Sequence, residues 1–194
     1  RGFKRTFVHW AAAEFNWPGH TEQDLFAVNK VLNEQDFMPL VDIHFLLTTL
    51  KMGRHYKGQF KLTKAGSELV AQPGRLFGII APFYLLEVDH RNWGRFPDEP
   101  LLGNWTIFLN VLNVEAENGV TGATLRHLLF GKPDPSPFPR YDEVMGNLYI
   151  QLLRPLCWTG LLQETRPAKS FRAQESIFTK TPLWKAALTL DTDP

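Results

Sequence analysis

The same short pattern of leucines occurs twice in this chain of 194 residues. Residues 46–50 and 152–156 both read Leu-Leu-x-x-Leu, at an offset of 106 positions. A glycine follows each copy, at Gly53 and Gly160, and a basic stretch comes next. The phrase Leu-Thr-Lys at 62–64 then corresponds to Phe-Thr-Lys at 178–180. Such recurrence predicts two copies of one supersecondary unit.

Each copy predicts the same order of local structures. Apolar residues from Leu40 to Met52 recur at helical spacing, and the glycine beyond them suits a helix C-terminus. Residues 54–62 are typical of two short strands joined by a turn at 55–58, in which Gly58 can take positive φ. Thr63 then caps a helix over 66–71, and Pro182 stands just inside the corresponding helix over 182–190.

Further helices are expected over 7–15, 23–32, 105–114 and 121–130, with Thr21 and Thr121 as caps. An apolar helical stretch over 73–87 breaks near Pro82. Residues 92–100 are typical of a linker, and 131–139 hold four prolines in an extended loop. The sequence therefore predicts a mainly α fold with small β-hairpin wings (α+β). Two such repeats, over 1–95 and 96–194, are expected to pack together.

The phrase Phe-Lys-Leu-Thr-Lys-Ala-Gly at 60–66 resembles the wing and following helix of winged-helix domains in bacterial regulators. A similar phrase occurs in some plasmid and mobile-element proteins. The resemblance covers residues 35–75 well. It covers 141–190 more loosely. That copy has no glycine in the place of Gly66 after its Thr-Lys, and its wing is longer. It implies a tandem winged-helix protein of bacterial type, which is a fold and not yet a function.

The formal net charge is only +1, so attraction to nucleic acid must come from a local cluster of cations. The densest cluster is the first hairpin, with Tyr56 and Phe60 interleaved and no acid between its ends. Its basic residues are Lys51, Arg54, Lys57, Lys61 and Lys64. Lysine and arginine contact phosphates, and aromatic rings stack on unpaired bases. Alternatively, the lysines protect a solvated hairpin edge from aggregation.

The second hairpin has a weaker basic cluster, formed by Arg166, Lys169 and Arg172. If DNA is bound, we therefore expect the first hairpin to bind it.

The helix before the first hairpin does not look like a reader of base edges. Its core stripe consists of Leu40, Ile43, Leu46, Leu47 and Leu50. The opposite face carries Val41, Phe45 and Met52, and an apolar outward face favours a partner surface. We predict that another part of the chain, or a second copy of it, buries these three residues. The alternative function is therefore a protein-interaction or dimerisation module on the same scaffold.

Catalytic motifs are not recognisable, so we expect no enzyme and no cofactor. No two of the six histidines form a metal-binding pair at helical spacing, and neither a nucleophile elbow nor a phosphate loop is present. Cys157 is the single cysteine, which precludes an internal disulfide and favours a buried thiol and a reducing, cytoplasmic setting. The apolar stretches are too short to span a bilayer, so no membrane partner is expected.

Overall fold

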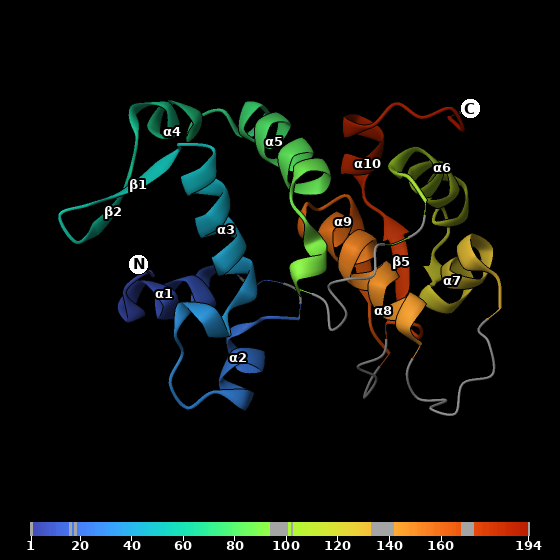
Figure 1. The fold of residues 1–194 in the computed structure, drawn as a ribbon, viewed down its shortest axis with the longest axis horizontal. Coiled ribbons are helices and arrows are strands. Elements are labelled where there is room, and N and C mark those ends of the chain that lie inside the picture. The colour runs from blue at the N-terminus through green and yellow to red at the C-terminus, as the bar shows by residue number, and fades with distance from the viewer. Residues whose placement is uncertain are drawn as a thin grey trace. The chain divides into compact units, whose positions relative to one another are not determined.

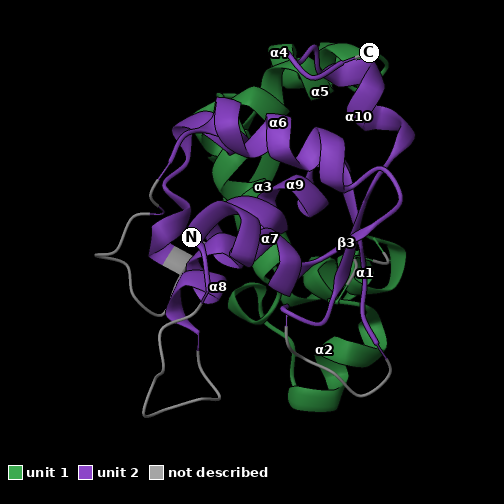
Figure 2. Ribbon diagram, turned by 90° about the vertical axis from the view of Figure 1, so that its right-hand side faces the viewer, with its two compact units in different colours: residues 1–84 green, residues 85–194 purple. Residues whose placement is uncertain are grey.

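The computed structural model describes residues 2–15, 17, 19–93, 101, 103–132, 142–167 and 173–193. Contacts within the chain divide it into two compact units, Arg1–Tyr84 (unit 1) and Leu85–Pro194 (unit 2), which Figure 2 colours separately. Much of the sequence-predicted linker over 92–100 and of the proline-rich loop over 131–139 lies outside the described residues. Both units are mostly helical with a small antiparallel sheet, which confirms the predicted α+β class.

Unit 1 begins with two helices and ends with two more, on either side of a helix and hairpin (Figure 1). Its elements are α1 (Arg5–Phe15), α2 (Glu22–Val28), the 3-10 turn η1 (Glu34–Asp36), α3 (Met38–Thr49), β1 (Gly53–Tyr56), β2 (Gln59–Leu62), α4 (Lys64–Leu69) and α5 (Pro73–Pro82). A π-helical turn, η2 (Phe83–Glu87), follows Pro82. Thr21 caps α2 as predicted, in a capping box with Asp24. The helix ends at Val28 and not at Leu32 as the sequence predicts.

The core of unit 1 lies where α1 and α2 meet the start of α3. Ala11 and Ala12 are small enough to let the neighbouring elements approach α1 closely. The larger buried side chains of this cluster are Val8, Leu25, Leu32, Phe37 and Leu40. Each contributes roughly 1.5–3 kcal/mol through burial of its apolar surface. Leu32 is fully buried in this core although it lies beyond the end of α2.

The hairpin β1–β2 forms in the predicted place. Its antiparallel register pairs Arg54 with Lys61 and His55 with Phe60. The two turn residues, Lys57 and Gly58, have φ of 45° and 78°. Positive φ at both positions gives a turn whose twist matches that of the flanking strands. Because side chains alternate along a strand, Arg54 and Lys61 share one face, while His55 and Phe60 share the other.

Unit 2 has a longer helical stretch before its hairpin and one additional strand. Its elements are the 3-10 turn η3 (His90–Trp93), α6 (Trp105–Glu115), β3 (Val120–Thr121), α7 (Gly122–Phe130), α8 (Glu143–Leu148), the π-helical turn η4 (Tyr149–Leu153), α9 (Arg154–Trp158), β4 (Leu162–Thr165), β5 (Ile177–Lys180) and α10 (Pro182–Ala187). Thr121 caps α7 as predicted. The sheet order is β3-β5-β4, and both pairings are antiparallel. The sequence does not predict β3.

A buried polar side chain, Asn113 of α6, ties the end of the chain to the core of unit 2. Its Oδ1 accepts hydrogen bonds from Trp184 Nε1 at 2.9 Å and Lys180 Nζ at 3.1 Å. Its Nδ2 donates to Thr192 and Asp193, both at 3.0 Å. Both the oxygen and the nitrogen of the side-chain amide therefore have hydrogen-bond partners, as is usual for a buried polar group.

The same arrangement of hydrogen bonds closes the base of both hairpins. In unit 1, Thr63 Oγ1 donates to the Lys51 carbonyl at 2.8 Å and Thr63 N donates to the Met52 carbonyl at 2.9 Å. In unit 2, Thr181 Oγ1 donates to the Gly160 carbonyl at 2.6 Å, and Thr181 N donates to the carbonyl of the next residue at 3.1 Å. We call this arrangement the threonine clamp.

The threonine clamp corrects the register in which the two copies correspond. Lys51 matches Gly160, and both take positive φ, of 57° and 77°. The offset is therefore 109 before the hairpin and 118 after it, in place of the sequence-based 106 and 116. Thr179 lies inside β5, and Thr181 is the counterpart of Thr63. The sequence pattern is misleading because a lysine and not a glycine takes the left-handed conformation in unit 1.

Candidate nucleic-acid interface

The outer face of the first hairpin gathers three cations around one aromatic ring. The charged groups of Arg54, Lys57 and Lys61 lie 5.6, 5.4 and 5.7 Å from the centre of the Tyr56 ring. Tyr56 is 46% exposed, and all three cationic residues are exposed. We call these four residues the basic face. Strand periodicity and the Arg54–Lys61 pairing bring them together, so charges separate in sequence become one positive patch.

Lys51 and Lys64 stand at the base of the same hairpin. Lys51 follows the end of α3, Lys64 is the first residue of α4, and both are exposed. The ion pairs among the described residues involve neither of them, nor any cation of the basic face. The five predicted cations therefore act as a positive cluster that no acid of the described chain neutralises.

The second hairpin differs because its basic residue is paired. Arg166 donates to the Glu164 carboxylate at 2.9 and 3.0 Å and to the Tyr149 hydroxyl at 2.9 Å. Hydrogen bonding to Glu164 raises the pKa of Arg166 above its usual range. Lys169 and Arg172, the other two predicted basic residues, lie outside the described residues. The described part of this hairpin therefore offers little free positive charge.

The apolar face predicted on α3 is divided in the structure. Met52 is buried at 4% exposure, Val41 is half-buried, and Phe45 is 47% exposed. Asp42 is also buried, and its carboxylate accepts a hydrogen bond from Tyr84 at 2.7 Å. A helical wheel built on apolar residues alone could not place this carboxylate in the interior. Coverage of Phe45 by a second copy stays a prediction.

Sequence reasoning missed a chain of titratable groups behind the basic face. The Nε2 atoms of His44 and His55 lie 2.9 Å apart, and His44 Nδ1 lies 2.5 Å from a carboxylate oxygen of Glu34. The other oxygen of Glu34 accepts a hydrogen bond from the backbone N–H of Phe3. Because a carboxylate oxygen accepts, His44 Nδ1 donates to Glu34, and one of the two Nε2 atoms donates to the other.

The two histidines escape a search at helical spacing because one lies on α3 and the other on β1. Only the hairpin register, which puts His55 on the same face as Phe60 and beside His44 of α3, could reveal the pair. Among the described residues, no group of three or more His, Cys, Asp or Glu is arranged to hold a metal ion.

Aromatic rings continue from this cluster onto the surface of α1. The Phe3 ring stacks on His44 at 4.2 Å between centroids and meets Phe60 edge-on at 5.0 Å. Phe7 lies 4.8 Å from Phe3, and Trp10 lies 5.2 Å from Phe7. Phe7 is 38% exposed and Trp10 is 50% exposed. The row therefore runs from half-buried rings to exposed ones.

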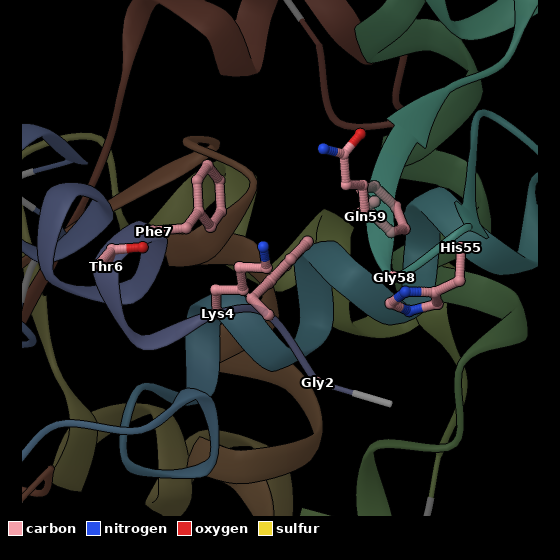
Figure 3. Close-up of a pocket in the computed structure, with 9 residues that line it drawn as sticks. Gly2, Lys4, Thr6, Phe7, His55, Gly58 and Gln59 are labelled. Atoms are coloured by element: carbon pink, nitrogen blue, oxygen red, sulfur yellow. The ribbon is translucent and has the colours of Figure 1, made fainter.

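A cavity of about 340 Å³ opens between the N-terminal segment and the hairpin (Figure 3). The N-terminal segment contributes Gly2, Phe3, Lys4, Thr6 and Phe7 to its lining, and the hairpin contributes His55, Gly58, Gln59 and Phe60. Figure 3 shows the Phe7 ring and the Gln59 side chain on either side of this space. The cavity thus combines aromatic surface, hydrogen-bonding groups and one lysine, and Gln59 of its lining pairs with Tyr56 of the basic face across the hairpin.

Cys157 is partly buried and has no disulfide partner. Burial raises the pKa of its thiol well above the usual range, so the sulfur stays protonated and weakly nucleophilic at neutral pH. This environment suits a structural residue and gives no support to a catalytic one.

Comparisons with known proteins divide the chain in two. The family model described as Y4jL N-terminal domain matches residues 1–75, and that described as y4jL C-terminal domain matches residues 94–182. The chain is also 37% identical, over 135 residues, to the "Uncharacterized protein y4jL" of Sinorhizobium fredii. That match covers 68% of this chain and 61% of the relative. No solved structure matches the chain.

None of the helices in the described part of the chain is long and apolar enough to cross a membrane.

Proposed function

We propose that this chain is a non-enzymatic, nucleic-acid-associated protein that contacts phosphate groups through the basic face of its first hairpin. The observation that carries the proposal is the convergence of Arg54, Lys57 and Lys61 on the exposed ring of Tyr56. A positive cluster with an aromatic centre offers both charge for the backbone and a surface for a base or sugar.

The electrostatics of the hairpin support a binding role. Arg54 and Lys61 lie directly opposite each other across the two strands. Like charges in this position destabilise a hairpin, by an amount of the order of a few tenths of a kcal/mol. A bound phosphate would remove this repulsion, so the unfavourable pairing is compensated in the complex. A hairpin edge protected only against aggregation would not need three cations around one ring.

We further propose that both units are winged-helix-like, as the resemblance implies. In each unit, two helices precede a longer helical stretch, which leads into a hairpin and a threonine-capped helix. This order of elements supports the proposal of a helix–helix–wing arrangement. It presents the basic face on a hairpin that projects from a packed helical base, where it can follow a nucleic-acid backbone.

Salt dependence of binding tests the proposal. Replacing Arg54 and Lys57 by Ala should weaken binding to most sequences alike. It should also flatten the plot of log affinity against log salt by roughly 1.8 for duplex DNA, since each phosphate contact contributes about 0.9. A fluorescence-anisotropy titration over several salt concentrations measures both effects.

The matched control replaces Lys30 and Arg75, which are exposed in the same unit and lie outside the hairpin. This variant removes the same two charges and should leave the salt slope within error of the wild type. Equal slopes for the two double variants, or no binding by the wild type at low salt, would reject the basic face as a nucleic-acid site.

Self-association is a second candidate function, and the exposure of Phe45 on α3 favours it. Phe45 stands one helical turn after the half-buried Val41, and an apolar surface formed by such neighbours can be covered by another protein. We propose a second copy of the chain as its partner.

A further inference from the structure

We propose that the cavity beside the hairpin receives an unpaired nucleobase, so that single-stranded nucleic acid is the preferred ligand of unit 1. This inference rests on the proposed function and specifies the class of nucleic acid. The cavity and the basic face share one hairpin: Tyr56 and Lys57 belong to the basic face, and Gly58, Gln59 and Phe60 line the cavity. Gln59 lies directly opposite Tyr56 across the two strands, so the two sites meet at the hairpin tip, where a strand held by the cations could turn a base toward the cavity.

The aromatic row supplies the stacking surface that such a base needs. Phe7 lines the cavity and is 38% exposed, and Trp10 extends the row with 50% exposure. Proteins that bind single strands combine a positively charged path with exposed rings, because every base has a face that can stack. In a duplex, both faces of each base are already stacked, so these rings would stay unused.

Polar groups at the cavity match the edge of a base and its phosphate. Thr6 and Gln59 offer a hydroxyl and an amide, each able to donate and accept hydrogen bonds. Lys4 lies on the N-terminal segment (Figure 3). It adds a positive charge on the side of the cavity opposite the hairpin. A base lying between these groups would have cations on both sides of it for the adjoining phosphates.

The wall of the cavity is held in place before any ligand arrives. Phe3 is fixed between His44 and Phe60, and the Glu34–His44–His55 chain joins η1, α3 and β1. Binding then orders few side chains, which lowers its entropic cost. The volume of about 340 Å³ lies at the small end of ligand sites, which suits one base and its sugar.

Affinity for single strands and duplexes tests the inference, with oligo-dT, oligo-U and a DNA duplex of equal length as probes. Phe7→Leu keeps an apolar side chain and removes the ring. It should lower affinity for the single strands roughly 5- to 150-fold, because stacking contributes about 1–3 kcal/mol per base. Duplex affinity should change less than about twofold. The two single-stranded arms show whether DNA or RNA is the tighter ligand.

Phe26→Leu is the matched control, because Phe26 is 37% exposed in the same unit and does not line the cavity. It should leave affinity for all three probes unchanged. Circular dichroism confirms that both variants fold. Tryptophan fluorescence gives a reading that does not depend on Phe7→Leu: single strands should quench Trp10, and Trp10→Phe should abolish that part of the quenching.

The possible outcomes separate this inference from the proposed function. If the wild type binds duplex as tightly as single strands and Phe7→Leu lowers neither, the cavity holds no base, although the basic face can still bind phosphate. If the wild type binds no probe at low salt, both proposals fail. Quenching that persists unchanged in Trp10→Phe would also overturn the inference.

Discussion

Gly66 of α4 lies close to the backbone of Met52, just beyond the end of α3. A Cβ atom at this position would stand 2.1 Å from the carbonyl oxygen of Met52, which already accepts hydrogen bonds from Thr63. Gly66→Ala must therefore push two backbone segments apart, and we expect it to lower the free energy of unfolding by about 1–3 kcal/mol. Urea denaturation of the two proteins measures the difference.

Gly78 in α5 serves as the control for that change, because a Cβ there meets no atom within 4 Å. Gly78→Ala should stabilise the protein by roughly 0.5–1 kcal/mol, since alanine loses less backbone entropy in a helix. Opposite signs at the two glycines are the expected result. Equal changes in the free energy of unfolding would show that the close approach of the Met52 backbone does not determine the effect of Gly66→Ala.

Single residues are predicted well when their role is local. The exposure of the basic face and the caps at Thr21, Thr63 and Thr121 follow from the sequence, because each depends on neighbours a few positions away. The contact of His44 with His55 does not, since it needs both the helix and the hairpin register. Sequence reasoning therefore finds the cations of the candidate site and misses its cavity.

At the scale of elements, α3 gives the prediction that separates the two candidate functions. If a second copy covers Phe45, Phe45→Ser should shift the protein from dimer to monomer at micromolar concentration, as measured by light scattering after size-exclusion chromatography. The substitution removes apolar surface, which contributes about 25 cal/mol to the free energy of association for each Å² that the dimer buries. Val28→Ser, an exposed apolar change on α2, is the control. A wild type that is monomeric at all concentrations would reject self-association.

The two hairpins show why some elements are easier to predict than others. Strands β1 and β2 follow from alternation around Lys57-Gly58, which is a local signal. Strand β3 has only two residues and exists because it pairs with β5, more than fifty positions later. No periodicity can reveal so short a strand. The end of α2 at Val28 is likewise hidden from a search for apolar periodicity, because Leu32 is buried in the core but lies outside the helix.

For the whole molecule, we predict that nucleic acid binds through unit 1. Residues 1–95 carry a formal charge of +3 and residues 96–194 carry −2. The described basic residue of the second hairpin is already paired with Glu164. Hydrogen exchange measured by mass spectrometry should therefore show slower exchange at residues 53–62 when oligo-dT is added, and unchanged exchange at 162–167. Equal protection of both hairpins would contradict this asymmetry.

The threonine clamp explains how one scaffold carries two such different hairpins. Only Lys57 and Gly58 join the strands in unit 1, whereas residues 166–176 join them in unit 2. Nine additional residues are thus accommodated beyond a base whose hydrogen bonds are the same. The clamp is in effect an insertion point: the reach and charge of a hairpin tip can be exchanged while the helices that hold it keep their packing.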